Sequence, residues 1–393
     1  MMLLEGVRVL DVTRYVAGPM CTALLADLGA EVIRIEPPGG GEDRTPLPIE
    51  DGFHAGAGFT QVMRNKRCLS LDLSKHEGQA VFDKLLASAD IVAANLPLAT
   101  VQQLGLSYER LCSVKPDIIF LHLTTFGTQG PYVNRVGFDA IAQVMSGITH
   151  LSGEPGKPMK SAAAYVDMSS GYLAAFGLMA ALRHRDRTGV GQQVAVNLLQ
   201  TAISISNYFL IEEDFNAYRR SGTGNRAQSG GPADLIPTAD GGVYMVALGN
   251  PMFKRWARAI GREDLVSDPR FQSDESRAEH GEALSAIATE WAASKTTQEV
   301  LAILEKNKIP AGPLLSPREV LDDPHVRQCF LQDVPVEGLP KPVPYVRPPV
   351  HFSKTPGRIC SGPPKPGADT EAVLTEAGFN TAQIDALRAA GTV

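Results

Sequence analysis

The chain has 393 residues, which is long enough for two domains that each bury a core. Hydrophobic residues make up 44% and charged residues 20%, an ordinary globular composition that argues against disorder. The formal net charge of −6 gives the molecule no general attraction for nucleic acid, so an anionic ligand needs a local cluster of Lys and Arg.

The N-terminal third alternates strands with helices. Residues 7–13 are apolar and β-branched, as in a buried strand, residues 18–29 have apolar side chains at helical spacing, and residues 31–36 predict a second strand. The alternation continues in predicted strands at 68–73, 90–96 and 117–127 and a helix at 76–89. Such strand–helix–strand units predict an α/β fold with a parallel sheet.

The rest of the chain changes character near residue 222. Before it, we expect helices at 139–151, 168–185 and 191–213. Residues 221–242 are rich in Gly, Pro and polar residues, which indicates a loop that enters a second domain. Beyond it we expect a strand at 242–248, helices around 251–261, 277–294 and 297–307, a Pro-rich return segment to residue 366, and a last helix at 369–388.

A nicotinamide-dinucleotide site is disfavoured. Glu36 ends the second predicted strand, where dinucleotide-binding folds place their ribose-binding acid. The turn after the first strand, however, is TRYVAGPM and lacks the GxGxxG glycines that let a pyrophosphate approach the helix. No cofactor is expected to be tightly bound.

Basic residues gather near the glycine loop that follows Glu36. Arg34 and Arg44 flank this loop, and residues 64–67 read Arg-Asn-Lys-Arg. Such a cluster on an acidic protein suits an anionic ligand such as a nucleotide phosphate, although a solvated surface would show the same residues.

Asp167 lies at the start of a predicted helix and has two interpretations. An Asp there is typical of an N-cap, whose side chain accepts hydrogen bonds from free backbone N–H groups. The helix dipole would also hold the carboxylate ionised, so a chemical role is compatible with capping.

Other site types are not indicated. The eight histidines form no HxxxH or HExxH pair, so we expect no metal, and Ser169 and Ser170 lie in no GxSxG turn. The five cysteines are scattered without a CxxC pair. No basic n-region opens the chain and no apolar run reaches the ~18 residues of a membrane span. We therefore expect a cytoplasmic protein without membrane or nucleic-acid partners.

Several segments, in the same order and over nearly the whole chain, resemble the family III coenzyme A transferases, the group of formyl-CoA transferase and carnitine CoA-transferase. They include VRVLDVTRYVAGPMCTALLADLGAEVIRIEPPGGGEDR, NKRCLSLDL, TTFGTQGPYVNRVGFDAIAQVMSGI, AAYVDMSSGYLAAFGLMAALRHRDRTG, GNRAQSGGPADLIPTADGG and IPAGPLLSPREVLDDPHV. The resemblance implies a Rossmann-like large α/β domain, a smaller α/β domain and an interlocked homodimer of two threaded rings. On this basis we expect the large domain at 1–221, the small domain at 222–325 and a return segment at 326–393.

The resemblance also implies site residues. The nucleophilic aspartate of the family falls on Asp167, and its glycine-rich active-site loop falls near Gly230 and Gly231. In relatives Phe-Arg-Pro-Gly follows the position of Asn95, whereas Leu-Pro-Leu-Ala follows it here, so one family arginine is missing. The expected coenzyme A contacts fall on Val16, Ala17, Arg34, Pro38, Lys66, Arg67 and Asn95.

The implied activity is the transfer of CoA from an acyl-CoA thioester to a free carboxylic acid, through an aspartyl anhydride and an aspartyl-CoA thioester. Two alternatives are kept. The related α-methylacyl-CoA racemases need a histidine where Phe138 stands here, and Phe cannot carry a proton, whereas Asp139 beside it matches an acidic position of the transferases. The other alternative is a non-catalytic CoA-binding protein.

The sequence does not name the acids. His54, Arg64 and Arg135 lie near the implied site in the sequence, and their charges suit a second carboxylate. We therefore expect a small carboxylic acid as acceptor, with a dicarboxylate as one candidate, and succinyl-CoA as donor.

Overall fold

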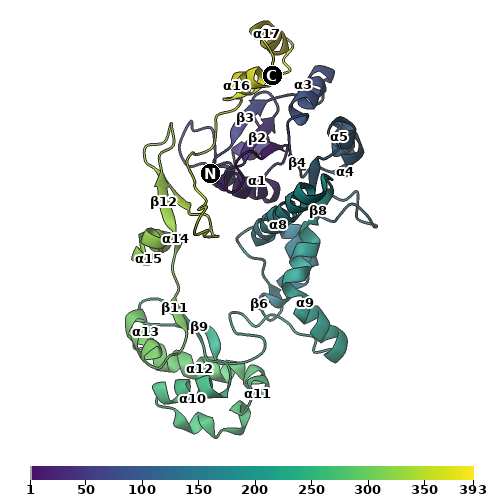
Figure 1. Cartoon of the computed structure of the whole chain (residues 1–393). Helices are drawn as coiled ribbons and strands as arrows, with labels where there is room; N and C mark the ends of the chain where they lie inside the picture. The colour runs from purple at the N-terminus through teal and green to yellow at the C-terminus, as the bar shows by residue number, and fades with distance from the viewer. Residues whose placement is uncertain (1) are drawn as a thin grey trace. The chain divides into compact units, whose positions relative to one another are not determined.

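A computed structural model describes residues 2–393 (Figure 1). Contacts divide these residues into two compact units. The segment 222–325, expected to form the small domain, lies in unit 2, which also takes in residues 147–160 and 207–221. We call unit 1 the residues 2–146, Ser161–Ser206 and Arg327–Val393, and unit 2 the residues Gly147–Lys160 and Asn207–Val326.

A six-stranded sheet forms the centre of unit 1. Its strands are β1 (Arg8–Asp11), β2 (Glu31–Glu36), β3 (Arg67–Ser70), β4 (Ile91–Ala94), β5 (Ile119–Thr124) and β8 (Gln193–Asn197). Every pairing is parallel, and the order is β3-β2-β1-β4-β5-β8. The order reverses between β1 and β4, as in doubly wound sheets. The expected α/β fold with a parallel central sheet is confirmed.

Helices cover both faces of this sheet. One face packs against α1 (Ala17–Asp27) and α8 (Tyr165–Thr188), and the other packs against α3 (His76–Leu86) and α5 (Tyr108–Val114). Successive residues of a strand point to opposite faces, so Val9 joins the first core and Leu10 the second. Because both faces are buried, the strands are nearly continuous apolar runs, which is why the sequence reveals most of them.

The end of the chain covers the β3 edge of the sheet. The backbone N–H groups of Cys68 and Ser70 donate to the Asp369 carboxylate at 2.8 Å and to Thr370 Oγ1 at 3.0 Å. An edge strand otherwise presents unpaired N–H groups, so these bonds protect β3 from pairing with another chain. The elements of this return segment are β12 (Leu331–Val334), β13 (Val343–Val346), α16 (Thr370–Glu376) and α17 (Thr381–Ala389).

Unit 2 is also α/β, with its own core around the buried side chains of Phe253, Trp256 and Leu284. Its three-stranded sheet is antiparallel in the order β11-β10-β9, formed by Ala311–Pro313, Gly242–Val246 and Ala233–Pro237. Its main helices are α10 (Asn250–Ala259), α11 (Asp274–Glu279), α12 (Gly281–Ala292), α13 (Thr297–Lys306) and α14 (Pro317–Asp322).

Three predicted helices were wrong in extent. Residues 193–197, expected to begin a helix, form the edge strand β8, and the helix α9 begins only after them (Leu198–Asn216). The helix expected over 139–151 is split into α6 (Asp139–Met145) and α7 (Ile148–Leu151), because Gly147 takes a left-handed φ of 87°. The helix expected over 369–388 is likewise split into α16 and α17.

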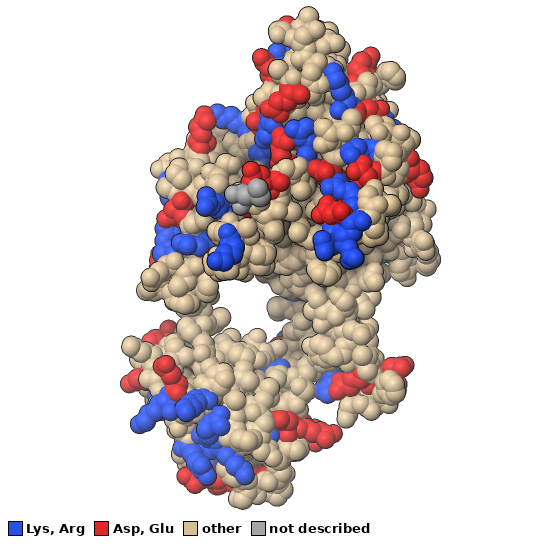
Figure 2. All heavy atoms as spheres, viewed as in Figure 1, with Lys and Arg blue, Asp and Glu red and all other residues tan. Residues whose placement is uncertain are grey.

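Charged side chains of both signs are intermixed on the visible face of unit 1 (Figure 2). Within residues 2–393, no helix is long and apolar enough to cross a membrane. In the same residues, no group of three or more His, Cys, Asp or Glu side chains is arranged to hold a metal ion.

Candidate active site

A pocket of about 540 Å³ opens in unit 1 at the carboxyl ends of β1, β4 and β5. We call it the β1/β4 pocket. Parallel α/β sheets bind ligands where the strand order reverses, because the two flanking loops leave in opposite directions and open a crevice between them. The β1/β4 pair is that reversal point here. The lining comprises residues 14–17, 95–99, 123–127 and 133–138 together with Glu42, Asp167 and Leu198.

Asp167 reaches this pocket because α8 packs tightly on α1. A Cβ added to Gly171 would lie 2.8 Å from the carbonyl oxygen of Ala17 and 3.0 Å from Cβ of Met20, so only glycine permits this approach. Asp167 lies four residues earlier, on the same face of α8 as Gly171. The glycine therefore brings the carboxyl group of Asp167 beside the start of α1, where Val16 and Ala17 also line the pocket.

The sequence suggested that Asp167 is the N-cap of its helix, but the structure shows that it is not. The helix begins at Tyr165, and the N-cap residue is Ala164, which has no side-chain acceptor. The missing acceptor is supplied by Asp139, whose carboxylate accepts the backbone N–H groups of Val166 at 2.8 Å and Asp167 at 3.0 Å.

Asp139 is itself buried, with 8% of its surface exposed, and also accepts a hydrogen bond from Gln143 Nε2. Three donors thus hold its carboxylate. The capping role that we had assigned to Asp167 belongs to Asp139.

The electrostatic setting of Asp167 also differs from the expectation of a permanently ionised carboxylate. Burial raises the pKa of Asp167 from its ordinary value of 3.8 to about 7, and the nearby negative charge of Asp139 adds to the rise. Asp167 is therefore a carboxyl group that gains or loses its proton near neutral pH, as groups at reactive sites often do.

Four further predicted site residues line the β1/β4 pocket: Val16, Ala17, Asn95 and Phe138. The side chain of Asn95 joins two of the loops, because its amide accepts the N–H of Arg14 and donates to the carbonyl of Arg14, both at 2.7 Å. The Phe138 ring is 59% exposed and meets the Tyr15 ring edge-on at 5.4 Å.

The predicted coenzyme A contacts Arg34, Pro38, Lys66 and Arg67 do not line this pocket. All three N–H bonds of the Lys66 ammonium group are used inside the chain, by Asp11 Oδ2 at 2.9 Å, Thr22 Oγ1 at 2.8 Å and the carbonyl of Pro19 at 2.9 Å. Arg34 is paired with Asp43 and Glu36, and Arg67 with Glu31 and Glu376. These cations were predicted from their clustering and from the family resemblance, and neither shows whether a cation is already paired.

Of the residues suggested for a second carboxylate, only Arg135 lines the pocket. Arg64 donates to both oxygens of buried Asp27, and His54 Nε2 contacts the carbonyl of Pro363. The guanidinium of Arg135 lies 4.6 Å from the ring centre of Tyr132 and forms no ion pair among residues 2–393.

Arg14 is a lining residue that the sequence analysis missed. Its guanidinium lies 3.9 Å from Glu42. Its position directly after the first strand was the signal by which the sequence could have identified it as a lining residue. Where the family arginine after Asn95 is missing, residues 96–99 present apolar side chains to the pocket.

Gly230 and Gly231, predicted in an active-site loop, belong to unit 2 and directly precede β9. The backbone of Gly230 packs closely against Leu248 and Asp274. Their place in an active-site loop stays a prediction.

Comparison with known proteins gives a consistent picture. A family model described as CoA-transferase family III matches residues 4–370. A succinate–glutarate CoA-transferase of Agrobacterium fabrum is 33% identical over 386 residues, covering 95% of both chains. A succinyl-CoA–D-citramalate CoA-transferase of Chloroflexus aurantiacus is 33% identical over 329 residues, covering 82% of this chain and 81% of that protein. The crystal structure of a CAIB/BAIF family protein from Brucella suis superimposes with a TM-score of 0.84 at 30% identity, covering 96% and 99% of the two chains.

The raised pKa of Asp167 predicts a specific dependence of stability on pH. A carboxyl group with a raised folded-state pKa contributes stability that is fully present below its unfolded value near 3.8 and is lost as pH rises through about 7. Asp167→Asn should remove this loss. The free energy of unfolding of the variant, relative to that of wild type, should therefore rise by on the order of 1–3 kcal/mol between pH 4 and 8.

Urea unfolding at several pH values measures this difference. Asp385→Asn, which changes an exposed carboxylate of α17, should run parallel to wild type. If the Asp167→Asn curve is also parallel to wild type, the titration assigned to Asp167 is wrong.

Proposed function

The chain belongs to CoA-transferase family III and is a CoA-transferase, and on that premise we propose that it moves CoA from succinyl-CoA to a small dicarboxylic acid through covalent intermediates on Asp167. The observation that carries this proposal is the position of Asp167 in the β1/β4 pocket, together with its neutral-range pKa. Among the described residues, Asp167 and Glu42 are the two acidic groups that line the pocket.

The proposed reaction proceeds by acyl exchange on one carboxyl group. The ionised Asp167 attacks the thioester carbonyl of the donor, which gives a mixed anhydride and expels CoA thiolate. The thiolate attacks the aspartyl carbonyl, which releases the donor acid and leaves an aspartyl-CoA thioester. The carboxylate of the acceptor attacks this thioester, and the freed thiolate then attacks the acceptor acyl carbonyl, which regenerates Asp167.

The environment of Asp167 suits this chemistry. Its side chain accepts no hydrogen bond among residues 2–393, whereas the adjacent Asp139 accepts three, so the two carboxyl groups have separate tasks. Burial leaves the ionised form of Asp167 poorly solvated, which favours its attack on a neutral thioester. Asp139 holds the helix start and thereby the position of Asp167.

The two alternative functions are not favoured. A racemase needs a proton carrier at the position of Phe138, and no histidine lines the described part of the pocket. A non-catalytic CoA-binding protein does not explain a titrating carboxyl group in the pocket, and the relatives are named for the transfer reaction.

The dicarboxylate acceptor is supported by Arg135. It is a pocket cation without a carboxylate partner among the described residues, and aromatic contacts with Phe126 and Tyr132 restrict its guanidinium. A guanidinium matches a carboxylate bidentately. Both compared relatives are named for dicarboxylic acids.

We also propose the interlocked homodimer. Helices α8 and α9 leave large apolar side chains in solvent, with Phe176 at 73%, Tyr208 at 63% and Phe215 at 81% exposure, and α6 exposes Ile141 and Val144. A monomer seldom keeps such faces uncovered. A second copy of the chain is the proposed cover.

We predict that Asp167→Asn folds and loses CoA transfer. Because Asp139 does the capping, the substitution leaves the start of α8 intact, while an amide cannot serve as the nucleophile. In wild type, kcat/KM should rise with pH through an apparent pKa near 7, since it reports the free enzyme.

An isotope experiment follows the covalent step. With an acceptor labelled with ¹⁸O in its carboxylates, one oxygen of each acceptor stays on Asp167 and leaves with the next donor acid. Succinate released under multiple turnover should therefore carry one ¹⁸O, and mass spectrometry of the Asp167 peptide should show the same label. Unlabelled succinate, or normal turnover by Asp167→Asn, refutes the mechanism.

We predict that Arg135→Gln raises the KM of dicarboxylic acceptors by about 10- to 100-fold, the effect of losing a charge-assisted hydrogen bond. The KM of monocarboxylic acids of equal length should change little. Initial rates with glutarate and with its monocarboxylic analogue measure the difference, and Arg318→Gln on α14, which is exposed, is the control. An equal rise in KM for both acids would mean that Arg135 binds CoA instead.

We predict a dimer of twice the 42.1 kDa chain mass in sedimentation. Threaded subunits cannot separate without unfolding, so differently tagged dimers should form no hybrids when mixed under native conditions, and should form them after joint unfolding and refolding. A stable active monomer contradicts the dimer, and rapid exchange contradicts the threading.

A further inference from the structure

Tyr15 has a backbone conformation that its sequence does not favour. It lies between β1 and α1 with a φ of 65°, in the left-handed region that residues with a Cβ other than Asn and Asp rarely enter. Such a residue persists only where the surrounding structure holds it. The next residue, Val16, already lines the β1/β4 pocket and occupies the N-cap position of α1.

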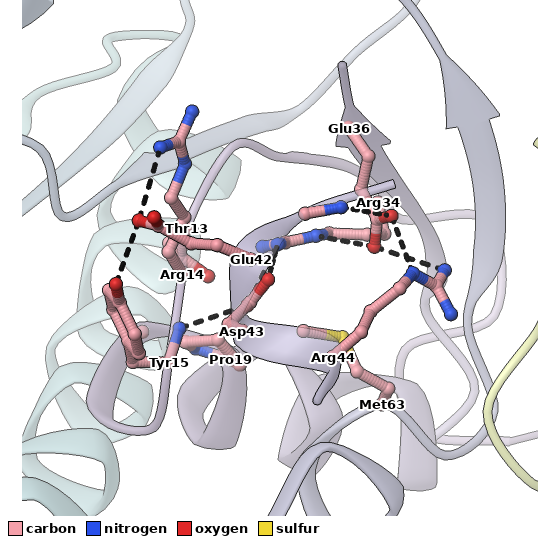
Figure 3. Close-up of polar contacts among 12 residues, drawn as sticks. Thr13, Arg14, Tyr15, Pro19, Arg34, Glu36, Glu42, Asp43, Arg44 and Met63 are labelled. Atoms are coloured by element: carbon pink, nitrogen blue, oxygen red, sulfur yellow. Dashed lines mark hydrogen bonds and ion pairs between the residues drawn. The ribbon is translucent and has the colours of Figure 1, made fainter. Parts of the chain in front are cut away.

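Side chains from two other loops hold this turn. Asn95 binds the N–H and the carbonyl of Arg14. The N–H of Tyr15 donates to Asp43 Oδ2 at 3.0 Å (Figure 3). Asp43 comes from the short helix η1 (Glu42–Arg44) that follows the glycine loop. It is 4% exposed and does not line the pocket.

A chain of buried charges fixes Asp43 in turn. Nη2 of Arg34 donates to both carboxylate oxygens of Asp43, at 3.0 and 3.2 Å, and Nε of Arg34 donates to Glu36 at 3.3 Å. Glu36 also accepts a hydrogen bond from the N–H of Gly41, and one from Arg44 that Figure 3 shows. Asp43 is thus unable to rotate away from Tyr15 without breaking a buried ion pair.

The turn decides how the chain enters the pocket. After Tyr15, the N–H groups of Val16, Ala17 and Gly18 have no hydrogen-bond partner among residues 2–393, and Val16 and Ala17 share the pocket with Asp167. A change of φ at Tyr15 would alter the path by which the chain enters Val16 and Ala17, which line the pocket.

We propose that Asp43 is a positioning residue, which keeps Tyr15 left-handed so that the start of α1 faces the CoA thioester. This inference rests on the proposed function. Asp43 acts through Tyr15 and touches no substrate.

The test is a rescue of Asp43 variants by a glycine at the strained position. Asp43→Ala removes the acceptor and should lower kcat/KM for succinyl-CoA by about 10-fold or more, as misplaced binding groups do. Glycine adopts a positive φ without strain, so Tyr15→Gly should restore the double variant to within about 3-fold of Tyr15→Gly alone. Tyr15→Phe, which loses only the hydroxyl, should give no rescue.

A purely structural role for Asp43 predicts the opposite. Loss of the Arg34 ion pair would then lower Tm and activity together, and Tyr15→Gly would add to the defect. If Asp43→Ala does not fold, Asp43→Asn, which keeps an acceptor, should show a smaller loss that Tyr15→Gly also reverses. Wild-type kinetics in either Asp43 variant, absence of rescue by glycine, or equal rescue by Tyr15→Phe would overturn the proposal.

Binding of free CoA, measured by calorimetry, separates this proposal from the proposed function. Affinity should fall in Asp43→Ala and recover with Tyr15→Gly, whether or not the protein turns over. If wild type transfers no CoA yet this pattern holds, the function fails and the positioning role stands. If wild type transfers CoA but the pattern is absent, the positioning role fails alone.

Discussion

The reversal of strand order between β1 and β4 is the constraint on which the site depends. Connections that leave these neighbouring strands in opposite directions cannot cover the crevice between them. The side chain of Asn95 ties the loop after β4 to the loop after β1. Gly171 then allows α8 to approach Ala17, which places Asp167 at the same point. One topological feature thus gathers residues from three distant parts of the sequence.

Buried ion pairs determine which charges remain for a ligand. Removing Lys66, Arg64 or Arg34 from water costs several kcal/mol for each ion, and only a well-placed anion with full hydrogen bonding offsets this. Asp11, Asp27 and Asp43 fill that role. Most of the basic cluster therefore stabilises the frame of the pocket, and the cations that line the pocket are Arg14 and Arg135. The cations that cluster in the sequence and the cations that line the pocket are therefore different residues.

Two carboxyl groups close together, Asp139 and Asp167, have opposite environments. Asp139 accepts three hydrogen bonds, two of them from backbone N–H groups at the positive end of α8. Burial, together with the nearby charge of Asp139, makes the ionisation of Asp167 unfavourable. The same carboxylate thus fixes the position of its neighbour and raises the neighbour's pKa. Any ligand that brings positive charge or hydrogen-bond donors into the pocket would favour the ionised form of Asp167.

The sequence by itself determined the parallel sheet and the place of Asp167 in the chain. Strands buried on both faces are continuous apolar runs, so residues 7–13 and 31–36 can be recognised as strands from their own sequence. The ordered motifs around Asp167 identify the family. It did not reveal β8, because Gln193–Asn197 leads directly into a long helix and becomes a strand only by pairing with β5. Nor did it reveal that Asp139, 28 residues away, caps α8.

The paired state of Lys66 and Arg34 was equally hidden. A residue type shows which bonds a side chain can form, whereas the partners that form them come from other segments, 55 residues away in the case of Lys66 and Asp11. Burial and proximity set the pKa of Asp167, and both arise only when the chain has folded. The tertiary structure therefore decided which groups are free, which are paired and which titrate.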